Sequence, residues 1–186
     1  MTSGVRAEPA TGLFDKIAFI GTGKMAQAMI DPLITNGYQP AEKVCVYDVS
    51  TKSMEKMKSV YPDIQTSESI GEAVHDAECI VLAVKPQNIN VSFWNQFPSL
   101  ESDSDKGGSG FRVRKDATLL SILAGTPVKD FAPSGISKIV RGWVIENAAT
   151  IPCSLVLGYY HSMFACLNIV VLSYDFTRVA CQIRLQ

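Results

Sequence analysis

The chain has 186 residues, enough for one well-buried domain with an appendage, and its 47% hydrophobic and 19% charged residues are typical of a globular protein. Its 17 basic and 18 acidic residues give a net charge of −1, which provides no electrostatic footprint for nucleic acid. The 5 cysteines are scattered and never form a Cys-x-x-Cys pair, so we expect buried free thiols and no metal site or disulfide framework.

Residues 1–14 contain no long apolar stretch of the kind found in a secretory signal. They hold one arginine, Arg6, followed by Glu8, whereas a mitochondrial leader usually carries several arginines and no acid. We therefore expect this segment to be a flexible leader and the protein to be cytoplasmic.

Short apolar runs then recur along the chain, with helical stretches between them. Continuous runs of this kind, bounded by Gly, Asp or Pro, predict strands that are buried on both faces of a parallel sheet. The runs are residues 16–21, 43–48, 78–84, 118–124 and 137–140.

The segment after the first run has the signals of a helix. Gly37 lies where a helix C-terminus favours a left-handed residue, and Pro32 inside the pattern allows a kink or an early end. Apolar residues recur at helical spacing and predict the buried face; they are Met25, Met29, Leu33 and Ile34.

Two more helices are predicted, over residues 50–62, where Ser50 or Ser53 can act as the cap, and over residues 67–77. Strands and helices thus alternate through residues 15–141. This order predicts an α/β fold, a doubly wound Rossmann-type parallel sheet flanked by helices. Residues 101–110 are all small or charged and predict a flexible loop within this domain.

The C-terminal part, residues 142–186, is an atypical apolar tail, and residues 147–174 contain no Asp, Glu, Lys or Arg. The interpretation that we favour is that this tail is an unrelated sequence, from a retained intron or a misjoined gene model. The alternatives are a divergent segment that packs on the sheet and, as a minor one, a membrane anchor. Residues 151–174 are long enough to span a bilayer, but Gly158, His161 and Asn168 interrupt them.

A glycine turn connects the first strand to the first helix. Gly21, Gly23 and Ala26 form the pattern Gly-x-Gly-x-x-Ala. In dinucleotide-binding folds the first glycine allows a tight turn, the second admits the pyrophosphate, and the third small residue lets helix and strand pack closely. The N-terminus of the helix then presents free N–H groups to the anion. The pattern predicts a nucleotide site, and plain tight-turn glycines are the alternative.

Asp48 ends the second strand, where an acid commonly accepts hydrogen bonds from the adenosine ribose and favours NAD over NADP. The alternative is a strand-end acid that caps the next turn with Ser50. Val49 occupies the place of a phosphate-binding arginine, yet Ser50, Thr51 and Lys52 are candidates to hold a 2′-phosphate. We expect NAD or NADP as the cofactor, with a preference for NAD.

The third predicted strand ends in LAVKPQN and the fourth in SILAGTPV. Both ends lie at the carboxyl edge of the predicted sheet, where such folds bind ligands. Pro86 makes the first of these turns rigid. Lys85 is either a ligand-binding residue or a solvated surface lysine.

Together these motifs resemble the pyrroline-5-carboxylate reductase family. The stretches IAFIGTGKMAQAMI, AVKPQN and LLSILAGTP occur in the family's order and cover residues 16–141. The resemblance implies hydride transfer from NADH or NADPH to the C=N carbon of a cyclic imine. It also implies cofactor-binding residues at the pyrophosphate (Gly21, Thr22, Gly23, Lys24 and Met25), on the nicotinamide side (Ala83, Val84, Lys85 and Pro86) and in the same crevice (Ala124 and Gly125).

The match stops after Arg141. In the family an all-helical domain follows, which forms the dimer and supplies most of the substrate pocket, whereas here the atypical tail takes its place. The chain is therefore expected to be the cofactor-binding half of such a reductase, with unknown catalytic residues. The alternative is a non-catalytic NAD(P)-binding module or a truncated product. Another dehydrogenase, of the 6-phosphogluconate or prephenate type, is disfavoured by the GKMA and VKPQ strings. A methyltransferase is the remaining alternative if nicotinamide binding fails.

Two histidines and two aromatic residues are not assigned to the site. His75 is expected on the surface of a helix, away from the strand ends, and His161 lies in the tail. Neither is assigned as a general acid. Trp94 and Phe97 are expected to pack in the core.

Overall fold

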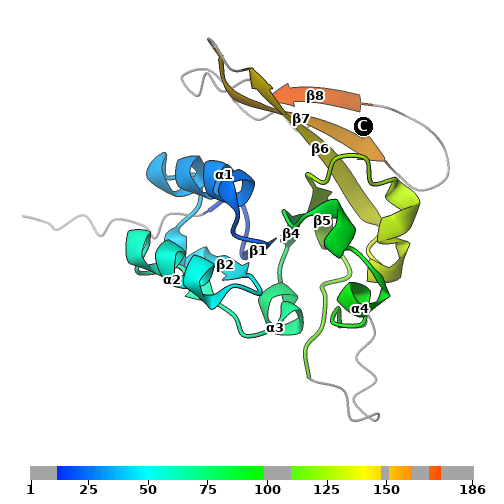
Figure 1. Ribbon diagram of the computed structural model, residues 1–186, viewed down its shortest axis with the longest axis horizontal. Helices are drawn as coiled ribbons and strands as arrows, with labels where there is room; N and C mark the ends of the chain where they lie inside the picture. Colours follow the sequence, from blue (N-terminus) through cyan, green and yellow to red (C-terminus); the bar gives the residue numbers. More distant parts are fainter. Residues whose placement is uncertain (1–11, 99–109, 148–150, 161–167, 173–186) are drawn as a thin grey trace, which may run out of the picture.

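The computed structural model describes residues 12–98, 110–147, 151–160 and 168–172, with side chains up to Gly142 (Figure 1). Most of the predicted leader and flexible loop, and the tail segments 161–167 and 173–186, lie outside these residues. The elements are β1 (Ile17–Ile20), α1 (Lys24–Thr35), η1 (Ala41–Lys43), β2 (Val44–Tyr47), α2 (Thr51–Val60), β3 (Gln65–Thr66), α3 (Ile70–Val74), β4 (Cys79–Leu82), η2 (Pro86–Asn88), α4 (Val91–Trp94), β5 (Thr118–Ser121), η3 (Val128–Ser134), β6 (Lys138–Asn147), β7 (Ile151–Tyr160) and β8 (Asn168–Leu172).

The strands form one sheet in the order β3-β2-β1-β4-β5-β6-β7-β8. Pairing is parallel from β3 through to β6, as the apolar runs predict, and it becomes antiparallel from β6 to β8. The chain begins in β1, fills one side with β2 and β3, and then crosses to β4 on the other side. This doubly wound order confirms the predicted Rossmann-type α/β fold.

Each face of the sheet is covered by its own helices. α1 and α2 pack one face, where Ala26, Ile30 and Met57 join alternate residues of β1 and β2 in a buried cluster. The other face carries α3, α4 and η3, with Phe93 and Phe131 among the buried residues. Strands that are apolar in every position are therefore covered from both sides, which explains their continuous hydrophobic runs.

The first helix differs from its prediction in two respects. It continues past Pro32, which is buried inside it, and reaches Thr35 before Gly37 turns the chain with φ of +71°. Met25 is not part of the buried face, since 38% of its surface is exposed. The helical spacing is therefore correct, but the Met25 side chain is only partly covered. Met29, Leu33 and Ile34 pack against the core as predicted.

Caps fix the ends of the next two helices. The Ser50 hydroxyl accepts a hydrogen bond from the Ser53 amide at 3.3 Å at the start of α2, and the Ser69 hydroxyl accepts one from the Glu72 amide at 3.2 Å at the start of α3. Of the two predicted candidates, Ser50 is therefore the cap. The strand β3, of two residues, and the short helix α4 were not predicted, because elements of this length carry no periodic signal.

The strand β6 is longer than the predicted run. Residues 138–141 of β6 pair with β5 on one side, and residues 139–147 pair with β7 on the other, so that β6, β7 and β8 extend past the short parallel strands (Figure 1). The described parts of the apolar stretch 151–174 are thus strands. Within the described residues, none of the helices has the length and apolar character needed to cross a membrane.

Cys45 and Cys79, the two cysteines with described side chains, are buried and free. Burial raises the pKa of the Cys79 thiol to about 12 and also raises the pKa of Cys45, which lies 3.0 Å from the Ser67 hydroxyl. A protonated, buried thiol is a poor nucleophile. We therefore expect iodoacetamide at neutral pH to leave both residues unmodified in the folded chain and to modify both in denaturant, as read by peptide mass spectrometry. Rapid native labelling of either thiol would contradict this burial.

Candidate functional site

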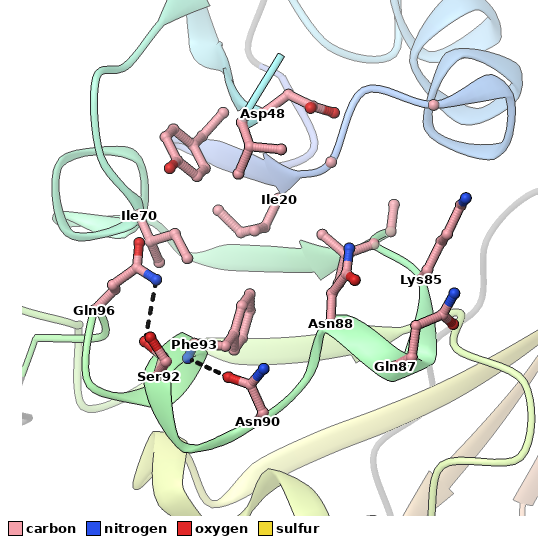
Figure 2. A pocket seen from close by; sticks show the side chains of 16 residues that line it. Ile20, Asp48, Ile70, Lys85, Gln87, Asn88, Asn90, Ser92, Phe93 and Gln96 are labelled. Carbon is pink, nitrogen blue, oxygen red and sulfur yellow. Dashed lines mark hydrogen bonds between the residues drawn. The ribbon is translucent and has the colours of Figure 1, made fainter.

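A cleft of about 640 Å³ lies at the carboxyl ends of β1, β2 and β4 (Figure 2). β1 is the point where the strand order reverses, and open α/β sheets bind ligands at this position. The residues that line the cleft come from these strand ends and from α3, η2 and α4. They are Ile20, Gly21, Gly23, Tyr47, Asp48, Val49, Ile70, Ala83, Val84, Lys85, Gln87, Asn88, Asn90, Ser92, Phe93 and Gln96.

Gly21 is required by the fold itself. Its φ is +101°, and a Cβ at this position would lie 2.7 Å from the carbonyl oxygen of Ala83. The Gly21 amide donates a 2.7 Å hydrogen bond to the carbonyl of Tyr47. The turn after β1 thus lies directly against the ends of both neighbouring strands, and only glycine fits there.

Gly23 is different, because nothing in the fold requires a glycine at this position. Its φ of −65° is open to any residue, and no protein atom lies within 4 Å of the place where a Cβ would be. It is the N-cap of α1, without a side-chain cap and without an acidic residue in the first turn. The N-terminus of a helix of 12 residues is therefore open toward the cleft, with room for an anionic group to approach the backbone.

Asp48 connects the end of β2 to the glycine turn. Its Oδ2 accepts hydrogen bonds from the Thr22 amide at 2.8 Å and from the Thr22 hydroxyl at 3.0 Å, and its Oδ1 accepts one from the Ser50 amide at 2.9 Å. Thr22 is completely buried, and its carbonyl accepts a bond from the Gln27 side chain at 2.8 Å. Asp48 therefore has the capping role foreseen as an alternative while it still lines the cleft.

The cleft combines an apolar interior with a polar rim. Ile20, Ile70 and Phe93 are buried, whereas Gln87 and Asn88 are exposed amides after β4 (Figure 2). On the α4 side, the Asn90 side chain accepts a 3.0 Å bond from the Phe93 amide, and the Gln96 side chain donates a 3.1 Å bond to the Ser92 carbonyl. An apolar surface beside side-chain amides suits a flat heterocycle with polar edges.

Charge in the cleft is sparse. Among the described residues that line it, Asp48 is the one acid and Lys85 the one base. Lys85 is exposed and extends from the end of β4, apart from Asp48 (Figure 2). The site thus has a carboxylate beside β2 and an ammonium group beside β4.

The structure brings together about half of the residues predicted for the cofactor. Gly21, Gly23, Asp48, Ala83, Val84 and Lys85 line the cleft, and Thr22 lies buried directly behind it. The other predicted residues do not line it; they are Lys24, Met25, Ser50, Pro86, Ala124 and Gly125.

These six residues lie outside the cleft for different physical reasons. Lys24 and Met25 project from the first turn of α1 into solvent, and Ser50 caps α2. Pro86 opens η2 with its ring exposed. Ala124 and Gly125 follow β5, one strand beyond β4, and are exposed at the same edge of the sheet. A resemblance assigns positions in a motif, and it does not say which side chains face the cleft.

Several lining residues were not predicted. Gln87 and Asn88 belong to the stretch LAVKPQN and could have been predicted to line the cleft. They are polar residues that follow a buried strand, and such residues lie at the ligand-binding edge of the sheet. Ile20, Tyr47 and Val49 lie at the ends of the predicted strands, so their signal was available too. For the residues on and around α3 and α4 no local signal exists, because these helices reach the cleft only through packing. The unpredicted lining residues are Ile20, Tyr47, Val49, Ile70, Gln87, Asn88, Asn90, Ser92, Phe93 and Gln96.

His75, Trp94 and Phe97 have the structural roles that were expected. His75 follows α3 outside the cleft, and its Nδ1 accepts a 3.1 Å hydrogen bond from the Arg112 amide. The rings of Trp94 and Phe97 pack 5.1 Å apart against the core. His161 lies outside the described residues.

The chain was compared with known proteins. Residues 16–103 match the family described as NADP oxidoreductase, coenzyme F420-dependent. Pyrroline-5-carboxylate reductase of Haemophilus influenzae is 46% identical over 72 residues, which are 38% of this chain and 25% of that protein. Pyrroline-5-carboxylate reductase 1 of Bacillus subtilis is 28% identical over 166 residues, which are 84% of this chain and 50% of that protein.

Solved structures agree with these relatives. A pyrroline-5-carboxylate reductase from Coxiella burnetii superposes with a TM-score of 0.58 at 25% identity, over 71% of this chain and 44% of that one. The chain thus spans a quarter to a half of the relatives it matches. This part of the chain, with its glycine turn, its acid after β2 and its VKPQ turn on a Rossmann-type sheet, is therefore similar to the N-terminal part of pyrroline-5-carboxylate reductases.

Proposed function

We propose that the cleft binds a nicotinamide dinucleotide, NAD(H) or NADP(H), and that the chain is the cofactor-binding half of an imine reductase. The reaction proposed is the reduction of 1-pyrroline-5-carboxylate to proline, the activity after which the relatives are named. The observation that carries the proposal is Gly23, a glycine with an ordinary φ and open space above it at the N-terminus of α1. The fold does not need this glycine, whereas a pyrophosphate that approaches the helix backbone does.

The cleft-lining residues supply binding and orientation. We propose that the first amides of α1 hold the pyrophosphate, that Asp48 accepts a ribose hydroxyl, and that the apolar surface of Ile70 and Phe93 packs against the adenine. Lys85 is proposed to lie on the nicotinamide side of the cofactor. When bound, a reduced nicotinamide supplies the hydride for the C=N carbon of the imine. The relative from Plasmodium falciparum, whose structure has NADP bound, shares the fold at 23% identity and a TM-score of 0.50.

A non-catalytic dinucleotide-binding module is the second candidate. It is favoured by Ala124 and Gly125, which are exposed after β5 and lie outside the cleft, although the resemblance implies that they approach the same crevice. The small-molecule substrate, the oligomeric state and the cytoplasmic location also stay predictions.

Two measurements on the purified chain separate these functions. Calorimetric titration with NADH and NADPH tests binding, and the loss of reduced-nicotinamide absorbance, with and without pyrroline-5-carboxylate, tests turnover. Binding with substrate-dependent oxidation supports the reductase. Binding without oxidation supports the non-catalytic module, and the absence of any binding contradicts both.

A further inference from the structure

The polar groups of Thr22, in the middle of the glycine turn, are all bonded within the protein. Its amide and hydroxyl donate to Asp48 at 2.8 and 3.0 Å, and its carbonyl accepts a 2.8 Å bond from Nε2 of Gln27. Thr22 is completely buried, whereas Gln27 is half-buried on α1. The turn is therefore held on its amide side by the residue after β2 and on its carbonyl side by a helix side chain.

The bond from Gln27 fixes one particular peptide group. The carbonyl of Thr22 and the amide of Gly23 belong to the same planar trans peptide, in which the C=O and N–H bonds point in opposite directions. A side chain of α1 that holds the carbonyl therefore holds the Gly23 N–H pointing away from that side chain. The backbone amide of Gln27 also donates a 3.0 Å bond to the Gly23 carbonyl, so the next peptide group is fixed as well.

The glycine at position 23 makes this restraint important. A peptide group next to a glycine flips more easily than others, because glycine adopts positive φ about as readily as negative φ. Gly23 has a φ of −65° and open space beside it, so no packed side chain opposes a flip. A flip would present the Thr22 carbonyl to an anion where the Gly23 N–H now points. The bond from Gln27 to that carbonyl would have to break first.

The peptide groups that Gln27 fixes carry amides that are available to a ligand. Among the residues that the structure describes, the Gly23 and Lys24 amides have no hydrogen-bond acceptor, as is usual for the first amides of a helix. Gly23 lines the cleft, whereas Gln27 does not. Gln27 can therefore influence a ligand in the cleft only through the turn that it holds.

We propose that Gln27 is a positioning residue for the pyrophosphate of the dinucleotide, an inference that rests on the proposed function. It acts through the Thr22 carbonyl and keeps the Gly23 amide in the donating orientation before the ligand arrives. A donor that is oriented in advance does not have to be ordered during binding, and this increases affinity.

The test compares Gln27→Met with the unmodified chain. Methionine is similar to glutamine in length and in helix propensity, but it cannot donate to the Thr22 carbonyl. We expect the dissociation constant for NADH, measured by titration calorimetry, to rise about 10-fold, which corresponds to about 1.4 kcal/mol. Gln27→Asn, whose amide is on a side chain too short to reach the carbonyl, is expected to give the same result and is the second variant in case the first does not fold.

Gln65→Met is the matched control. Nε2 of Gln65 donates a bond of the same kind to the Glu42 carbonyl, at 2.6 Å, and Gln65 does not line the cleft. This variant is expected to bind NADH as tightly as the unmodified chain. An equal loss of affinity in Gln65→Met and Gln27→Met would overturn the specific role of Gln27.

The amide resonance of Gly23 in a proton–nitrogen correlation spectrum distinguishes positioning from a general loss of stability. NADH is expected to move this resonance strongly in the unmodified chain and much less in Gln27→Met, while the Asp48 resonance still moves. Unchanged affinity in Gln27→Met, or weaker affinity with the same movement of the Gly23 resonance, would overturn the role of Gln27 and leave the dinucleotide function intact. A failure of the unmodified chain to bind NADH would overturn the proposed function as well.

Discussion

Gly23→Asp is expected to abolish dinucleotide binding while leaving the fold as stable as before or slightly more stable. Aspartate is a better N-cap than glycine, so α1 gains about 0.3 kcal/mol from the new cap. The same carboxylate occupies the open space above the helix N-terminus, where a pyrophosphate would lie. Two unit charges 4 Å apart repel by about 4 kcal/mol at a partly exposed site, so we expect affinity to fall at least about 100-fold. Thermal unfolding and NADH titration of the same sample measure both effects.

The Gly23→Ser variant distinguishes the effect of side-chain charge on cofactor affinity from the effect of side-chain volume. Serine also caps a helix and has no charge, so stability is again expected to hold, and affinity is expected to fall by only about 10-fold because the close approach of the ligand is hindered. Equal losses in the two variants would mean that steric exclusion alone matters. Unchanged affinity in Gly23→Asp would contradict the pyrophosphate position and, with it, the proposed function.

Gly21→Ala is expected to destabilise the whole domain. The backbone at this position has φ of +101°, and the added Cβ would lie 2.7 Å from the Ala83 carbonyl oxygen and 2.8 Å from its carbon. Positive φ costs an alanine about 1–2 kcal/mol, and a clash with backbone atoms adds about 1–3 kcal/mol. We therefore expect a loss of about 3 kcal/mol in the free energy of unfolding, or about 10 °C in Tm, measured by urea and thermal unfolding.

Gly37→Ala is the matched control for this change. Gly37 also has a positive φ, of +71°, but no atom lies within 4 Å of its Cβ position. The cost there is expected to be about 1 kcal/mol, from backbone strain alone. The difference between the two variants thus measures the contact between the glycine turn and the end of β4. Similar losses in both would show that the turn does not lie against Ala83 in solution.

The two glycines of the turn show how much of the site was predictable. Their spacing after an apolar strand predicts a dinucleotide turn, in which the first glycine allows the tight turn and the second admits a pyrophosphate. In the structure Gly21 is needed for contact between strands, and Gly23 is the position left open for a ligand. Asp48 was likewise predicted as a ribose acceptor or as a cap, and in the structure its carboxylate accepts bonds from Thr22 of the glycine turn and from the Ser50 amide.

The sequence alone predicted the alternation of the main strands and helices, a cap at Ser50 or Ser53, and the turns at Gly21 and Gly37. These features depend on hydrophobic period, on cap hydrogen bonds three residues away and on backbone φ, all of which are local. Tertiary structure decided which of these residues face the cleft. Met25 is exposed, Ile70 and Phe93 reach the site from helices, and Ala124 and Gly125 lie one strand outside it. Such positions depend on packing between segments far apart in the chain, for which a single sequence carries no periodic signal.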